Sequence, residues 1–181
     1  MLFNSAAFIF LYLPIVLAGT FVLARFRPGW AIGFLALASF AFYAAWDVRF
    51  LPLLLLSILG NYLIGRRILA GRRAKVWLTA GIAANLMLLG VFKYAGFFAA
   101  TGAALVGHAA PRLGIVLPLG ISFFTFTQIA YLVDAHRGQV RSQRPDSYAL
   151  FVSYFPHLIA GPILHHGEMN TFKDSHRPAP I

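Results

Sequence analysis

The stretch Phe155-Pro156-His157-Leu158-Ile159-Ala160-Gly161-Pro162-Ile163-Leu164 places a histidine, two prolines and a glycine inside an otherwise apolar run. The uncharged region around it, residues 147–167, is 21 residues long, which is about the length needed to cross a bilayer. A polar, helix-breaking patch at membrane depth is tolerated only where protein or a water-filled cavity surrounds it. Because ionisable residues inside a membrane usually serve a function, the stretch predicts a cavity.

The composition of the whole chain is typical of a membrane protein. Hydrophobic residues make up 60% of it and charged residues only 11%, against about 25% charged residues in an ordinary soluble domain. The mean hydropathy is +0.75. We therefore predict an all-α, polytopic membrane protein with about six transmembrane or re-entrant helices. The predicted segments are residues 5–24, 30–46, 50–69, 76–98, 114–133 and 148–164.

The distribution of basic residues predicts the orientation. The net charge is +10, but the cations form short clusters between apolar runs, so a nucleic-acid partner is not expected. Three loops, 25–29, 66–75 and 135–146, hold most of them. These are Arg25, Arg27, Arg66, Arg67, Arg72, Arg73, Lys75, Arg137, Arg141 and Arg144. The intervening loops hold three, Arg49, Lys93 and Arg112. The positive-inside rule then predicts an outside N-terminus.

Several residue types that often carry chemistry give weak or negative signals. There are no cysteines, which excludes disulfides, thiolate catalysis and cysteine-based zinc sites. His165, His166 and Glu168 lack a third metal ligand at suitable spacing, so no metal site is predicted. His157 has three readings: a hydrogen bond to a carbonyl freed by a nearby proline, the lining of a substrate path, or a catalytic base.

Polar residues inside the other predicted spans point to helix packing. Pro118 and Gly120 loosen the backbone early in the fifth span, where Ser122 can bond a freed carbonyl. Asn61, Asn85 and Gln128 are single amides within spans, and for them hydrogen bonding between helices is the default expectation.

Two segments remain ambiguous by pattern. Residues 97–113 begin with Phe97 and Phe98, and their pattern fits a helix at the membrane interface better than a membrane-spanning helix. The polar tail, residues 165–181, has no periodicity, so we expect the chain to be truncated there.

The motifs, taken in order, resemble the membrane-bound O-acyltransferase (MBOAT) family, in particular its branch of bacterial alginate O-acetylases. The resemblance covers about 170 residues. The motifs that carry it are Met1-Leu2-Phe3-Asn4-Ser5, Tyr12-Leu13-Pro14, Ser39-x-x-Phe42-Tyr43-x-x-Trp46, Asn61-Tyr62-x-x-Gly65, Phe92-Lys93-Tyr94, Leu117 to Phe123, Tyr131-x-x-Asp134-x-His136-Arg137-Gly138 and Phe155 to Leu164. His136 departs from the family, which usually has a tyrosine there.

The resemblance implies an acyl transfer in a bacterial inner (cytoplasmic) membrane. An acyl group, acetyl in this branch, would pass from a cytoplasmic thioester, which is acetyl-CoA or an acyl-carrier protein, to hydroxyls of a cell-surface polysaccharide such as alginate. No bound cofactor is implied. A periplasmic or membrane protein that relays the acyl group is the expected partner. Residues 1–164 would then form the N-terminal portion of one MBOAT membrane domain, which is part of a larger ring of helices.

The resemblance also implies where the catalytic group lies. The family's expected histidine occurs in its second half, in a Trp-His-Gly type of motif, and no Trp-His pair exists here. We therefore expect the catalytic histidine beyond Ile181, assign no catalytic residue within the chain, and expect the chain to be inactive alone. The candidate cavity-lining residues are Ser122, Pro156, His157, Gly161 and Pro162. The alternatives are a transporter or channel subunit, which would show paired broken helices, and a non-catalytic membrane scaffold.

Overall fold

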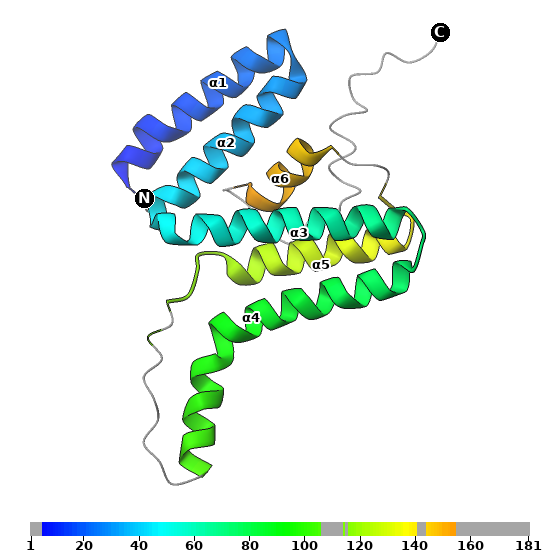
Figure 1. Cartoon of the computed structure of the whole chain (residues 1–181). Helices are drawn as coiled ribbons and strands as arrows, with labels where there is room; N and C mark the ends of the chain where they lie inside the picture. Colours follow the sequence, from blue (N-terminus) through cyan, green and yellow to red (C-terminus); the bar gives the residue numbers. More distant parts are fainter. Residues whose placement is uncertain (1–4, 106–113, 115, 141–143, 155–181) are drawn as a thin grey trace.

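The computed structural model describes residues 5–105, 114, 116–140 and 144–154, and its regular elements are all helical there (Figure 1). The all-α prediction is confirmed. In chain order the elements are a π-helical turn η1 (Phe8–Tyr12), α1 (Leu13–Phe26), α2 (Pro28–Asp47), a 3₁₀ turn η2 (Val48–Phe50), α3 (Leu51–Leu69), α4 (Ala74–Leu105), α5 (Ile121–His136) and α6 (Pro145–Ser153).

Proline marks the start of four of these helices. Pro14, Pro28, Pro52 and Pro145 each occupy one of the first two positions of a helix. At Pro28 and Pro145, which each follow an extended residue, the proline sacrifices no intrahelical hydrogen bond, because the first N–H groups of a helix have no partner, and its fixed φ suits the helix. The sequence therefore sets these two boundaries locally, before any packing between helices.

Three stretches of the described chain are long and apolar enough to cross a membrane: residues 8–26, 29–69 and 74–105. The second stretch is two helices, since η2 separates α2 from α3 and Figure 1 shows them meeting at an angle. The structure therefore agrees with several apolar helices in a multi-pass membrane protein. The shorter α5 and the described part of α6 do not reach spanning length.

Two predicted segments have different boundaries in the structure. The fifth was expected from residue 114, but α5 begins only at Ile121 because Gly120 adopts the left-handed conformation, with φ of 65°. The fourth was expected to end at residue 98, but α4 continues through Phe97 and Phe98 to Leu105. Figure 1 shows α4 bent, with its second half leaving the other helices. Residues 106–113 of the ambiguous segment lie outside the described residues.

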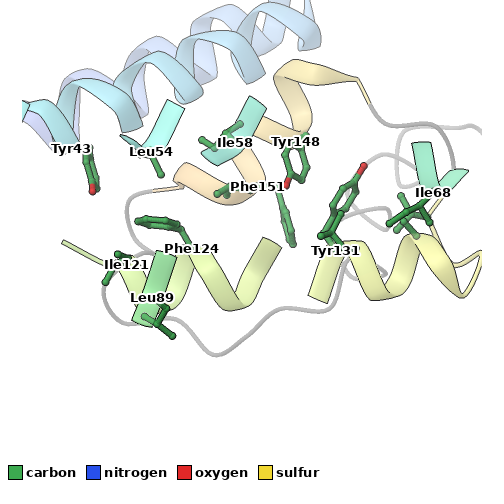
Figure 2. Close-up of a cluster of buried hydrophobic side chains, with 14 residues drawn as sticks. Tyr43, Leu54, Ile58, Ile68, Leu89, Ile121, Phe124, Tyr131, Tyr148 and Phe151 are labelled. Atoms are coloured by element: carbon green, nitrogen blue, oxygen red, sulfur yellow. The ribbon is translucent and has the colours of Figure 1, made fainter. Parts of the chain in front are cut away.

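The main core lies between α3, α5 and α6, with contributions from α2 and α4. Figure 2 shows Tyr131 and Tyr148 among its largest members, and their ring centroids are 4.4 Å apart. The buried members are Tyr43, Leu54, Ile58, Ile68, Leu89, Ile121, Phe124, Tyr131, Leu132, Ala135, Val140, Tyr148, Phe151 and Val152. A smaller cluster of Phe8, Val16 and Phe42 holds η1 and α1 against α2.

Connections rich in cations gather at one end of the helices. In Figure 1 the turn between α3 and α4 lies beside the end of α5. The guanidinium of Arg144, just before α6, lies 3.8 Å from where a Cβ on Gly29 would be. The first and third basic loops therefore meet in space, as expected of loops on one side of a membrane.

A close contact between α3 and α5 predicts an effect of substitution on stability. An ideal Cβ on Gly65 would lie 2.5 Å from the ring of Tyr131, and that ring is fully buried. We expect Gly65→Ala to lower the free energy of unfolding by about 1–3 kcal/mol through overpacking. Reversible unfolding of the chain in mixed micelles measures this.

The matched control is Gly33→Ala in α2, because a Cβ on Gly33 would meet nothing within 4 Å. That change should be neutral or stabilise by up to about 1 kcal/mol, since alanine favours a helix. Equal behaviour of the two variants would contradict the proposed close packing at Gly65.

Candidate functional site

One of the five predicted cavity-lining residues lies in the described part of the chain. Ser122 is the second residue of α5 and is half-buried. Pro156, His157, Gly161 and Pro162 lie outside the described residues, as do the polar tail and most of the segment 148–164. The cavity that these residues were predicted to line therefore stays a prediction.

The backbone before Ser122 is irregular, although it lies in an apolar sequence. Residues 116–118 are not helical and 119–120 form a turn. The N–H of Ile121 donates to the carbonyl of Pro118 at 3.3 Å, and the N–H of Phe124 donates to that of Gly120 at 3.0 Å. The prediction that Pro118 and Gly120 loosen the backbone here is confirmed, and the result places Ser122 in the first turn of a helix.

A second polar site joins α3, α4 and α5 through side-chain hydrogen bonds. The amide of Asn61 donates to Oε1 of Gln128 on α5 and, at 3.3 Å, to Oδ1 of Asn85 on α4. Asn85 Nδ2 donates back to Asn61 Oδ1 at 2.6 Å. The expectation that these three amides bond helices to one another is confirmed.

The same network is anchored to the backbone of two helices. Asn61 Nδ2 also lies 3.0 Å from the carbonyl of Ser57, so its two hydrogens are shared among three acceptors, and Asn85 Nδ2 donates to the carbonyl of Gly81 at 2.8 Å. The hydroxyl of Ser57 donates to Gln128 Oε1 at 3.0 Å. Each bond to the backbone spans four residues, so the amide side chains are held in fixed directions. Ser57 was not among the polar residues predicted to bond between helices. Its position one turn before Asn61 is the sequence signal that could have identified it.

Among the described residues, two buried polar atoms close to the network have no hydrogen-bond partner. They are Nε2 of Gln128 and the hydroxyl oxygen of Thr125, both on residues with 0% exposure. The two residues are three apart on α5 and therefore share a face of the helix. A buried donor without a partner costs about 1–3 kcal/mol, so this face of α5 has unused capacity to bind a polar group.

An open groove of about 280 Å³ lies between α3 and α4, and part of the network belongs to its lining. Its lining is mostly apolar and includes three members of the network, Ser57, Asn61 and Asn85. The full lining is Leu53, Leu56, Ser57, Gly60, Asn61, Ile64, Ala84, Asn85 and Leu88. None of these side chains titrates near neutral pH, so the groove can bind and orient a neutral group but supplies no general acid or base.

Comparison with known proteins gives related enzymes. The chain matches no family model and no solved structure. It is 40% identical to the peptidoglycan O-acetyltransferase of Helicobacter pylori over an alignment of 205 positions, which covers 96% of this chain and 39% of that protein. It is 42% identical to the probable alginate O-acetylase AlgI of Azotobacter vinelandii over 175 aligned residues.

The matched region is only part of each relative. The Azotobacter match covers 91% of this chain and 34% of that protein. The probable alginate O-acetylase AlgI of Pseudomonas aeruginosa is 40% identical over 91% of this chain and 33% of its own length. The chain thus spans a third to two fifths of the curated relatives it matches, in their N-terminal part.

The hydrogen-bond network predicts coupled effects of substitution. We expect Asn61→Ala and Asn85→Ala each to destabilise the chain, because each removes bonds between α3 and α4. In a double-mutant cycle the two changes should show a coupling energy of about 0.5–2 kcal/mol. Unfolding in mixed micelles gives the four free energies of the cycle.

Thr20→Ala provides the comparison, because the Thr20 hydroxyl bonds the carbonyl of Val16 within its own helix, at 2.7 Å. A cycle of Asn61→Ala with Thr20→Ala should show additive effects. Additivity of Asn61→Ala with Asn85→Ala would mean that the amides do not stabilise each other.

Proposed function

We propose that the chain forms the N-terminal part of a polysaccharide O-acetyltransferase. The reason is that it belongs to the alginate O-acetylase branch of the membrane-bound O-acyltransferase family. The observation that carries the proposal is the identity of about 40% to such enzymes over 91–96% of the chain. The apolar helices and the buried polar network agree with an enzyme built within a membrane.

The reaction transfers an acetyl group from a thioester to a hydroxyl. The hydroxyl oxygen attacks the thioester carbonyl, an ester bond forms, the carbon–sulfur bond breaks, and the hydroxyl proton is taken by a general base. The groove between α3 and α4 has no group that can act as this base. On the family resemblance alone, the base is proposed to be a histidine beyond Ile181, and the chain by itself is proposed to be inactive.

The donor and acceptor follow from the same relationship. The acyl donor is proposed to be a cytoplasmic thioester, acetyl-CoA or an acyl-carrier protein, both of which are anionic. The exposed arginines at one end of the helices would favour an anionic donor on that side. The acceptor is a polysaccharide hydroxyl, and the names of the relatives provide two classes, alginate and peptidoglycan. A protein partner that relays the acetyl group outside the membrane completes the proposal.

The proposed location is the inner membrane of a bacterium, with the N-terminus outside and the basic loops in the cytoplasm. The chain has no cysteine, so single cysteines can report the side on which each turn lies. We expect Val48→Cys, in the exposed turn η2, to react with an impermeant maleimide in intact spheroplasts. We expect Arg72→Cys, in the turn between α3 and α4, to react only after permeabilisation. The reverse pattern would overturn the orientation.

The function is tested by exchange. A chimaera is made in which this chain replaces the matching N-terminal region of the Pseudomonas aeruginosa relative, and polysaccharide O-acetyl content is measured in cells lacking that relative. We expect the chimaera to restore acetylation and the chain alone to restore none, because the general base is missing. A second chimaera carrying Gly65→Ala and Asn61→Ala should lose part of the activity through weakened packing of α3 on α5.

Two results would contradict the proposal. The first is a chimaera that accumulates in the membrane at the normal level and acetylates nothing. The second is purified chain that transfers labelled acetyl from acetyl-CoA to an alcohol acceptor, which would show that the base lies within residues 1–181.

A further inference from the structure

A hollow of about 560 Å³ opens at the connection between α1 and α2. Leu23, Phe26, Arg27 and Trp30 line it, so its walls are apolar apart from a single guanidinium. The hollow is distinct from the groove between α3 and α4, and it shares none of the lining residues of that groove.

The local backbone creates the hollow. Arg27 follows the last residue of α1 and precedes the first residue of α2. Its backbone is extended, with φ of −152°. The two helices therefore diverge at this residue, and the last turn of α1 and the first turn of α2 contribute one aromatic side chain each. Phe26 is 78% exposed and Trp30 is 65% exposed, although both are large and apolar. Exposed aromatic rings beside a basic residue are typical of the interface between bilayer and water.

The charge of Arg27 is not neutralised within the described residues. The two ion pairs found there join Arg49 to Asp47 and Arg144 to Asp146. Arg25 in the last turn of α1 adds further positive charge. The guanidinium of Arg144 approaches Gly29, but its charge is offset by the ion pair with Asp146. Among the described residues, an anion in the hollow would therefore meet the positive charges of Arg25 and Arg27.

We propose that this hollow binds one anionic phospholipid, with its phosphate on the Arg27 guanidinium and its first acyl methylenes against Phe26, Trp30 and Leu23. The site combines the two features that such a lipid needs, a cation at the membrane surface and an apolar wall continuing into the bilayer. The wall continues along α1, because Val22 lies one turn before Phe26 on the same helix face and is 55% exposed. The proposal does not depend on acetyl transfer.

The test uses Trp30 as a local reporter. The other two tryptophans are removed by Trp46→Phe and Trp77→Phe, and the chain is reconstituted in phosphatidylcholine vesicles with a minor, constant fraction of phosphatidylglycerol. One of the two lipids carries brominated acyl chains, which quench tryptophan at contact. We expect phosphatidylglycerol to quench Trp30 with an association constant roughly fivefold above that of phosphatidylcholine, as expected for one basic contact at a membrane surface.

The decisive comparison uses two variants with the same loss of charge. Arg27→Gln should remove the preference for phosphatidylglycerol, while Arg72→Gln, in the turn between α3 and α4, should keep it. Quenching by brominated phosphatidylcholine should persist in both and show that Trp30 remains at the membrane. Equal quenching by both lipids, or equal loss of preference in both variants, would overturn the proposal in favour of ordinary lipid contact or a general charge effect.

Discussion

The hydrogen bonds of Asn61 are the interaction on which the arrangement of α3, α4 and α5 depends. Lipid chains are as apolar as leucine, so burial of apolar side chains gives little drive for helices to associate inside a bilayer. Asn61 contacts two neighbours of α3, through Asn85 on α4 and Gln128 on α5. One buried side chain therefore links three helices.

The network forms because two glycines allow the helices to approach. On α3, Ser57, Asn61 and Gly65 follow one another at intervals of four residues and face α5, where they meet Gln128 and Tyr131. On α4, a Cβ on Gly81 would lie 2.5 Å from Leu132 of α5. Larger residues at these positions would separate the helices and lengthen the amide bonds. Close packing and hydrogen bonding thus support each other.

The sequence predicted the kind of interaction better than the pairs that make it. A lone amide in an apolar span has few ways to be satisfied, so hydrogen bonding between helices could be expected for Asn61, Asn85 and Gln128. Their pairing could not, because the partners of Asn61 lie 24 and 67 residues away. The start of α5 shows a related limit of prediction from hydropathy. The apolar sequence continues through residues 114–120, but the helix begins only after Gly120, which adopts the left-handed conformation.

The neutrality of the network indicates what this part of the molecule contributes. A buried charge at membrane depth costs several kcal/mol more than a neutral amide whose bonds are satisfied, so charged groups persist there mainly where function needs them. Asn61, Asn85, Gln128 and Ser57 carry no charge and cannot exchange a proton near neutral pH. They suit a rigid wall that holds helices in register. In an acetyltransferase of the proposed kind, the wall would position groups supplied by the rest of the enzyme, and the proton transfer would take place outside the described residues.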